Sequence, residues 1–470
     1  MAERSGKVGC ILTVANLYRQ HRPDMPIVFH RFWADRLRGL LSDWYDLAIA
    51  DVVCTEEEYE TAVRQCEREG CEALVLLPMA YTQSGIAVRP LSSTNLPLLI
   101  VSTARDISLP VDMTADHLLA NQMMHGVQDL TNALRRHQVS FEVLAGHFDD
   151  PAFSTKMRDA LNVALGASAL RTGKVGQIGG FFSGMLDFTF SETNRAGSIP
   201  FQIEGIDPRE LKNRSDAIDT EVVSGYVTDL ADRFSVSDDL TEMEKEMSSR
   251  YAIAMDTLMA DLDLDAVAVN FLDAIDQKLD TLPFLGAADL MAKGKGYGGE
   301  GDVISAGMGA ALATAFGAAT FTEFFCPDYA AGEILLSHMG ECNYALAAEN
   351  TPVRLVAKDF AWGDIHRPAV PVFQLRPGNV TLTSISERPG AESGSPGFQV
   401  IAVTGEVVEA EIHGNLQVPY SRFRPTTPLR EFLQHYSQTG GTHHLTLCYG
   451  DRVAGLRMLS RYCGFTFLTV

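Results

Sequence analysis

Residues 295–341 read KGYGGEGDVISAGMGAALATAFGAATFTEFFCPDYAAGEILLSHMGE, and the rest of the chain is organised around them. A glycine turn holds Glu300 and opens a helix of small residues that we expect over residues 303–318. Glu323 follows at the end of a strand rich in threonine and phenylalanine, and His338 comes after a short apolar run. The segment therefore predicts a helix and strands that carry two carboxylates and an imidazole.

The segment GGTHH, residues 440–444, lies far down the chain but belongs with the same set of side chains. Adjacent residues at the start of a strand point to opposite faces, so at most one of His443 and His444 is expected to face the glutamates. Two carboxylates and up to two imidazoles are the ligand types of a divalent-metal site. Their spacings match no local zinc motif, so other interpretations stay open.

Each of these side chains also has a purely structural interpretation. Glu300 can cap the following helix with the help of Asp302. Glu323 is expected to be buried and can be paired in a salt bridge, because an unpaired buried carboxylate is costly. His338 can be a hydrogen-bonded residue of the core.

The composition argues against several classes of protein. A formal net charge of −22 argues against a nucleic-acid binder and against docking on anionic lipid, because both need a basic patch. The sequence has no apolar run of about 18 residues that could span a membrane. The eight cysteines form no C-x-x-C pair, which is typical of reduced thiols in a cytoplasmic protein.

The chain of 470 residues exceeds what one hydrophobic core usually serves, so two to three domains are expected. Apolar strands at residues 7–15, 73–77 and 98–102 alternate with helices, which is typical of a doubly wound α/β sheet. A strand at residues 174–178 starts a second such domain. After about residue 345, short alternating segments between Pro and Gly turns predict an antiparallel sheet or barrel.

Two further segments hold candidate substrate residues. A helix over residues 112–136 carries the motif NQMMHG, residues 121–126, although plain helix packing with a surface histidine is the alternative. Ligands of open α/β sheets bind beyond the carboxyl ends of the strands, which makes Tyr18 a candidate. A tight turn after residue 178 makes Met185 a possible wall of the pocket.

Four motifs occur in a fixed order along the chain: GGEGD at residues 298–302, FTE at 321–323, SHMGE at 337–341 and GGTHH at 440–444. Together they resemble the signature of the L-arabinose isomerase family, within the wider group of L-fucose and L-arabinose isomerases. The motif N-Q-x-x-H-G and the weaker turn at residues 16–18 extend the resemblance over nearly the whole chain.

The resemblance implies a metal-dependent enzyme that interconverts an aldose and its ketose through a cis-enediol, with L-arabinose and L-ribulose as the expected pair. Mn²⁺, or Mg²⁺ or Co²⁺ in its place, is expected on Glu300, Glu323, His338 and His444. The two glutamates are expected to move the proton. The residues expected at the sugar are His125, Gln122, Tyr18, Met185 and His443.

The resemblance also implies an architecture. Two Rossmann-like parallel-sheet α/β domains, residues 1–170 and 171–320, are expected before an antiparallel β-rich, barrel-like domain at residues 321–470. We expect a cytoplasmic homotrimer or homohexamer whose active sites are completed between subunits. Its partner is a small-molecule sugar, without nucleic acid or membrane.

Two positions depart from the family pattern. The chain has Ala15-Asn16 where the family places Gln-His, and Phe325 where the family has a tyrosine. Both positions lie near the sugar in the family. Isomerisation of another pentose, a hexose or a deoxysugar is therefore the alternative, with a non-catalytic sugar-binding or regulatory homologue as the third possibility.

Overall fold

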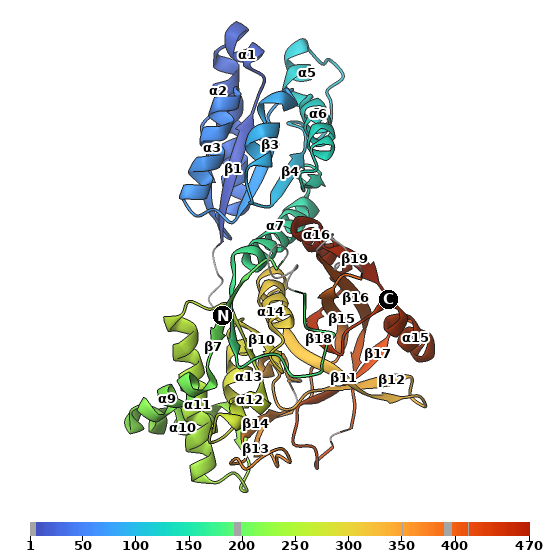
Figure 1. The fold of residues 1–470 in the computed structure, drawn as a ribbon. Coiled ribbons are helices and arrows are strands. Elements are labelled where there is room, and N and C mark those ends of the chain that lie inside the picture. The colour runs from blue at the N-terminus through green and yellow to red at the C-terminus, as the bar shows by residue number, and fades with distance from the viewer. Residues whose placement is uncertain (1–5, 192–198, 350, 390–396, 412) are drawn as a thin grey trace. The chain divides into compact units, whose positions relative to one another are not determined.

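The computed structural model describes residues 6–191, 199–349, 351–389, 397–411 and 413–470. These fold into two compact units (Figure 1). Unit 1 is Met1–Ser168 with Arg461–Gly464, and unit 2 is Ala169–Ser460 with Phe465–Val470.

Unit 1 is built on a five-stranded parallel sheet with the order β2-β1-β3-β4-β5. Its strands are β1 (Lys7–Thr13), β2 (Asp46–Ile49), β3 (Ala73–Pro78), β4 (Leu98–Ser102) and β5 (Glu142–Ala145). Its helices are α1 (Asn16–His21), α2 (Asp24–Leu41), α3 (Glu56–Arg68), α4 (Val88–Ser92), α5 (Ala115–Asn121) and α6 (Met123–Arg136). Helix α7 (Pro151–Thr172) then runs from unit 1 into unit 2. Apolar side chains of α3, α4 and α6 form one core cluster with those of β1, β3 and β4.

The single helix predicted over residues 112–136 is wrong, because α5 and α6 are separate helices. Gln122, between them, has a φ of −87° and a ψ of 30° and so leaves the helical conformation. The side chain of Asn121 donates to the carbonyl of His117 at 2.9 Å and to Asp106 at 2.8 Å. Side-chain bonds of this kind compete with the backbone bonds of a continuing helix.

Unit 2 begins with a four-stranded parallel sheet with the order β10-β9-β6-β7. Its strands are β6 (Lys174–Ile178), β7 (Gln202–Ile206), β9 (Ala266–Val269) and β10 (Gly296–Gly299). The helices of this part are α9 (Pro208–Ala217), α10 (Thr220–Arg233), α11 (Glu242–Asp261), α12 (Phe271–Asp276), α13 (Phe284–Ala292) and α14 (Val303–Phe316).

The remainder of unit 2 is an antiparallel barrel with the strand order β15-β18-β11-β12-β17-β16, which the pairing of β15 with β16 closes. The strands are β11 (Thr320–Asp328), β12 (Glu333–Ser337), β15 (Gly378–Glu387), β16 (Phe398–Val408), β17 (Tyr420–Pro425) and β18 (His444–Tyr449). Strand β19 (Thr466–Thr469) adds in parallel to β16. A small sheet comprises β8 (Ser235–Val236), β13 (Arg354–Ala357) and β14 (Ala369–Val372), and helices α15 (Leu429–Thr439) and α16 (Val453–Cys463) complete the set.

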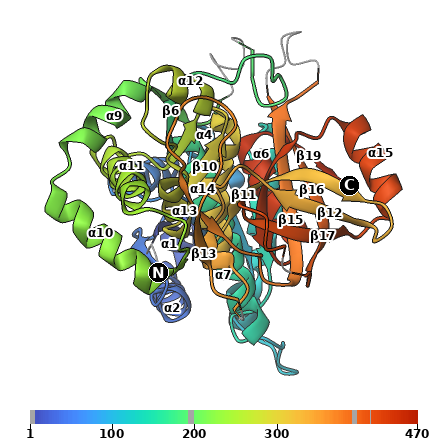
Figure 2. The ribbon, with the colours of Figure 1, turned by 90° about the horizontal axis from the view of Figure 1, so that it is seen from below.

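Helix α14 lies between the parallel sheet and the barrel and contacts strands of both. Figure 2 shows α14 with helices α9 and α10 on one side and the barrel strands on the other. Almost every residue of this helix is buried, and half are Gly or Ala. Small residues allow the helix backbone to approach β10 closely, because a Cβ on Gly296 would lie 2.0 Å from the carbonyl oxygen of Ala306. The close approach places the loop between β10 and α14 next to the barrel.

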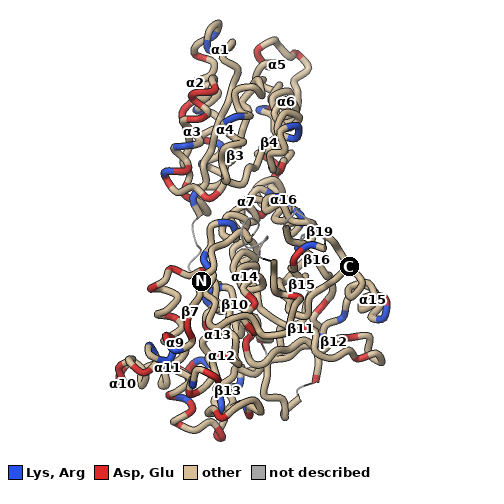
Figure 3. The backbone as a smooth tube through the Cα atoms, in the orientation of Figure 1, with Lys and Arg blue, Asp and Glu red and all other residues tan. Residues whose placement is uncertain are grey.

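The predicted fold class is confirmed: two parallel α/β sheets are followed by an antiparallel barrel. The division into three domains at residues 170 and 320 stays a prediction. Figure 3 shows acidic and basic positions interspersed along each unit. All eight cysteines are free thiols. In the part of the chain described here, the helices are too short or too polar to cross a membrane.

The close contact between β10 and α14 predicts that one methyl group added at residue 296 destabilises the fold. We expect Gly296→Ala to lower the free energy of unfolding by about 1–3 kcal/mol, because the added Cβ overlaps the backbone of α14. The matched control is Gly225→Ala in α10, where a Cβ meets nothing within 4 Å. There alanine should raise the free energy of unfolding by about 0.5–1 kcal/mol. Urea unfolding followed by circular dichroism measures both, and an unchanged midpoint for Gly296→Ala would contradict the packing.

Candidate active site

The loop between β10 and α14 holds Glu300 in an uncommon backbone conformation. Its φ is +58°, in the left-handed region that costs a non-glycine residue about 1 kcal/mol or more. Two bonds, one from β6 and one from the segment after it, hold the loop. Gln177 in β6 donates its side-chain Nε2 to the carbonyl of Gly301 at 3.1 Å, and Phe182 donates its backbone N–H to that of Glu300 at 3.0 Å. The side chain of Glu300 is largely buried. The backbone is thus held in a strained turn that places this carboxylate.

Asp302 caps helix α14, so the interpretation of Glu300 as the cap is wrong. The Oδ1 atom of Asp302 accepts from the backbone N–H groups of Ile304 at 3.1 Å and Ser305 at 2.9 Å. Its Oδ2 atom accepts from Nδ1 of His444 at 3.0 Å. Asp302 is fully buried, and its two oxygens join the start of the helix to the first residue of β18.

His444 is fully buried with one nitrogen engaged and the other unengaged. Its ring stacks on Phe188 with centroids 4.9 Å apart and meets Phe321 edge-on at 4.8 Å. Its Nε2 lies 3.5 Å from Oε2 of Glu300 and has no hydrogen-bond partner among the described atoms. Burial would lower the pKa of His444, but the carboxylates of Asp302 and Glu300 outweigh burial and raise the pKa.

His338 has the same arrangement. Its Nδ1 bonds Oε2 of Glu341 at 2.8 Å, and Tyr297 donates its hydroxyl to Oε1 of that carboxylate at 3.0 Å. Burial would raise the pKa of Glu341, but the interaction with His338 dominates and lowers the pKa. The ring edge of His338 lies against Gly299, where a Cβ would come within 2.6 Å of Cε1 and 3.1 Å of Nε2. His338 therefore presents Nε2 beside the Glu300 loop, with its ring centroid 5.5 Å from that of His444.

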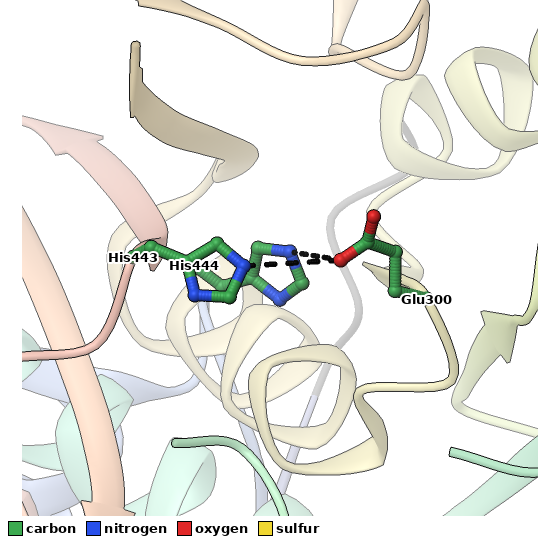
Figure 4. Close-up of side chains that lie close together, drawn as sticks. All are labelled: Glu300, His443 and His444. Atoms are coloured by element: carbon green, nitrogen blue, oxygen red, sulfur yellow. Dashed lines mark ion pairs between the residues drawn. The ribbon is translucent and has the colours of Figure 1, made fainter. Parts of the chain in front are cut away.

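Both histidines of the GGTHH segment approach Glu300, and the expectation that at most one would do so is wrong (Figure 4). His443 lies in a bend before β18, so the alternation of a strand does not apply to it. Its Nε2 is 3.8 Å from Oε2 of Glu300, and its Nδ1 bonds Oδ2 of Asp187 at 2.6 Å. Burial would lower the pKa of His443, but the bond to Asp187 and the nearby carboxylate of Glu300 raise it to about 10.

Glu300 itself is strongly acidic. Burial would raise its pKa, but the nearby rings of His443 and His444 and the charge of His338 lower the pKa to about 2. Glu323 is the register partner of His444 on the neighbouring strand, and directly opposite residues of an antiparallel pair share a face. Glu323 is the fourth residue of β11 and half-buried, so its predicted place at the end of the strand is wrong.

The remaining predicted site residues lie in two places. Met185 is half-buried in the segment after β6, two residues before Asp187. Tyr18 and Gln122 lie together in unit 1, where Gln122 donates Nε2 to the hydroxyl of Tyr18 at 2.7 Å. His125 is exposed on α6 in the same unit.

The geometry fits a divalent cation. Among the described residues, Glu300, His443 and His444 form a group whose ligand atoms lie within 4.8 Å of one another. His338 and Glu323 lie beside this group. A histidine whose Nδ1 is held by a carboxylate and whose Nε2 is unengaged is the usual arrangement of a metal-binding histidine. Carboxylate oxygen and imidazole nitrogen without sulfur suit Mn²⁺, Mg²⁺ or Co²⁺.

Sequence reasoning missed three carboxylates that orient the histidines: Asp187, Asp302 and Glu341. The spacing H-x-x-E in residues 338–341 was a usable signal for Glu341, because residues three apart in a turn can bond. Asp302 was visible only as a helix cap. Nothing in the sequence points from Asp187 to His443, which follows 256 residues later.

The chain is similar to known L-arabinose isomerases. The family model of the L-arabinose isomerase central domain matches residues 193–316, and that of the L-arabinose isomerase C-terminal domain matches residues 318–466. The L-arabinose isomerase of Leuconostoc mesenteroides is 26% identical over 91% of this chain and 90% of its own length. That of Mycolicibacterium smegmatis is 25% identical over 92% and 87%, and that of Shouchella clausii 23% identical over 92% and 88%.

The two oxygens of Asp302 have different partners, so a substitution can change the contact with His444 and still keep the cap of α14. We expect Asp302→Asn to keep the cap, because asparagine is a good N-cap, but to turn an amide N–H toward Nδ1 of His444. The ring must then change tautomer, and Mn²⁺ affinity should fall about 10–100-fold.

Isothermal titration with Mn²⁺ measures this effect. The matched control is Asp219→Asn, which alters the aspartate cap of α10 and should leave Mn²⁺ affinity unchanged. Asp302→Ala should lose the affinity and in addition about 1 kcal/mol of stability, since the cap is gone. Unaltered Mn²⁺ binding by Asp302→Asn would show that Asp302 does not set the tautomer of His444.

Proposed function

The chain belongs to the L-arabinose isomerase family, and from this premise we propose that it converts L-arabinose to L-ribulose with the help of a bound divalent cation. It is an isomerase that acts on an aldose and its ketose. The observation that supports a bound cation is the buried Nε2 of His444, which lacks a hydrogen-bond partner in the described structure and lies 3.5 Å from Oε2 of Glu300.

We assign the cation to Glu300, Glu323, His338 and His444, with Mn²⁺ preferred. The choice of His444 over His443 rests on burial, because His444 is fully buried whereas the side chain of His443 is 32% exposed. The exposed ring suits contact with the sugar. When bound, the cation supplies Lewis-acid polarisation of the substrate carbonyl and stabilises the developing oxyanion.

The two glutamates are proposed to perform the proton transfer. Isomerisation moves a proton from C2 to C1, and another from the C2 hydroxyl to the oxygen on C1, by way of a cis-enediol. Glu300 and Glu323 each offer carboxylate oxygens near the histidines, so one can accept the proton and the other can return it. Tyr297 and Glu341 keep the ring of His338 in place while this happens.

Unit 1 supports the proposal that subunits complete each other's sites. Six large apolar side chains are at least two-fifths exposed within residues 107–124: Ile107, Leu109, Val111, Met113, Leu118 and Met124. Exposed apolar residues gathered in one segment mark a protein–protein interface. His125 follows directly, so the same segment would carry it, with Gln122 and Tyr18, to the sugar of a neighbouring subunit. We propose a homotrimer or homohexamer on this basis.

The cytoplasmic location also stays a prediction. It is supported by the eight free thiols, which suit a reducing compartment.

The proposed activity predicts the outcome of a sugar panel. Aldoses that include L-arabinose, other pentoses, hexoses and deoxysugars are incubated with the chain and Mn²⁺, and ketose is measured. We expect L-arabinose to give the highest kcat/KM, and removal of the cation by EDTA to abolish turnover until Mn²⁺ is returned. Glu300→Gln should lower kcat at least 100-fold, because it removes both a cation ligand and a proton carrier. Glu221→Gln, an exposed residue of α10, is the charge-matched control.

The outcomes separate the alternatives. A higher kcat/KM for another sugar would support the alternative that the chain isomerises another pentose, a hexose or a deoxysugar. Exposed Phe325, two residues after Glu323, is the reason for that alternative. Ketose from none of the sugars would favour a binding protein, and full turnover by Glu300→Gln would show that the catalytic assignment is wrong.

The exposed apolar segment of unit 1 predicts assembly. Light scattering after size-exclusion chromatography should give three or six times the chain mass of 51.3 kDa. Leu109→Asp with Val111→Asp should yield smaller species, because buried charges weaken an apolar interface. Val222→Asp on α10, 54% exposed in unit 2, is the matched control. A chain that is monomeric without any substitution would contradict the proposal.

A further inference from the structure

The segment between β6 and β7 reaches the candidate site through Asp187. One oxygen of this residue, Oδ2, accepts two hydrogen bonds from the same partner: from Nδ1 of His443 at 2.6 Å and from its backbone N–H at 3.0 Å. The bond to the ring fixes its orientation, and the bond to the backbone fixes the bend that carries it. Burial would raise the pKa of Asp187, but both bonds lower the pKa, so its carboxylate is ionised at neutral pH.

His443 depends on this contact more than the other histidines depend on theirs. Its side chain is 32% exposed and lies in a bend outside the strand, whereas His338 and His444 are buried among rings and backbone. Among the described residues, the only side-chain hydrogen bond of His443 is to Asp187. Phe188 follows Asp187 in the chain, and its ring centroid lies 5.8 Å from that of His443 and 4.9 Å from that of His444. The segment therefore both holds and covers the rings.

The three carboxylate–histidine pairs therefore divide into two kinds. Glu341 and Asp302 are buried and direct two Nε2 atoms into the interior, where the cation is assigned. Asp187 is 37% exposed and directs the Nε2 of His443 to within 3.8 Å of Glu300 on a side that solvent reaches. A sugar can arrive only from such a side.

We propose that Asp187 is a positioning residue that holds the imidazole of His443 so that its Nε2 hydrogen-bonds a sugar hydroxyl next to Glu300. The inference rests on the proposed function for the identity of the ligand. A hydroxyl can donate to Nε2 or accept from it, so the contact works in either protonation state of the ring. Asp187 thereby contributes to sugar binding without touching the sugar or the cation.

The test compares Asp187→Ala, Asp187→Asn, His443→Ala and the double variant Asp187→Ala/His443→Ala. Leu186→Ala, 78% exposed on the neighbouring residue, is the control for general disturbance of the segment. Three quantities are measured: KM and kcat for L-arabinose, the affinity for L-arabinitol in the presence of Mn²⁺, and the affinity for Mn²⁺ alone. L-arabinitol presents sugar hydroxyls but cannot isomerise, so its affinity reports on binding without turnover.

We expect Asp187→Ala to raise KM and weaken arabinitol binding about tenfold, the size of one hydrogen bond, with Mn²⁺ affinity within about twofold. Asp187→Asn should lie between Asp187→Ala and the unmodified chain, because its amide oxygen can accept the same bonds without the charge. The double variant should bind arabinitol no worse than His443→Ala, since Asp187 acts only through that ring. A merely structural role would instead give additive losses, or equal losses of polyol and Mn²⁺ affinity, and either result would overturn the proposal.

The two proposals fail in distinguishable ways. If no aldose is turned over but arabinitol affinity falls in Asp187→Ala and not in Leu186→Ala, the isomerase assignment fails and the positioning role stands. If L-arabinose is isomerised and Asp187→Ala changes neither KM nor arabinitol affinity, the positioning role alone fails. An unmodified chain that neither binds arabinitol nor turns over a sugar overturns both.

Discussion

The carboxylate of Asp302 couples the fold of unit 2 to its chemistry. One oxygen accepts hydrogen bonds from two backbone N–H groups at the start of α14, and the other orients His444 on the barrel. A fully buried carboxylate costs several kcal/mol unless it is bonded, and here three donors from two layers supply the bonds. The helix and the barrel can therefore not shift relative to each other without unpairing this charge. The close approach of α14 to β10, which only glycine permits at residue 296, sets the position of Asp302 in turn.

The charges around this point are unbalanced in a way that favours a cation. Five carboxylates surround three imidazoles: Asp187, Glu300, Asp302, Glu323 and Glu341 face His338, His443 and His444. The low pKa of Glu300, about 2, and the raised pKa values of His443 and His444 show that the carboxylates dominate the local field. Protonated histidines can offset part of this charge. A divalent cation offsets it more completely, because it brings two positive charges to the unengaged nitrogens and to Glu300 together.

Local pattern predicted most elements but not the contacts that make the site. Strands β4 and β6 match their predicted residues, because apolar β-branched runs end at residues that favour turns. The Glu300 turn and the helix after it were also predicted, since Gly and Asp mark helix starts. The orientation of His443 was predicted wrongly, because a period of two applies only inside a strand and this residue precedes β18. The pairing of Asp187 with His443 could not be predicted, because it depends on where two distant segments meet after folding.

The strained turn explains why glutamate occupies residue 300. Its two neighbours must be glycine for steric reasons. A Cβ on Gly299 would overlap the ring of His338, and one on Gly301 would lie 2.2 Å from the carbonyl oxygen of Gly180. Residue 300 itself has a φ of +58°, where glycine would be relaxed and glutamate is not. Glycine at residue 300 would thus make the turn more stable locally by about 1 kcal/mol. The chain nevertheless carries a carboxylate there, within 4 Å of two imidazoles. A side chain held at a conformational cost, in a position that faces both rings, is retained for what its oxygens bind and not for the stability of the turn.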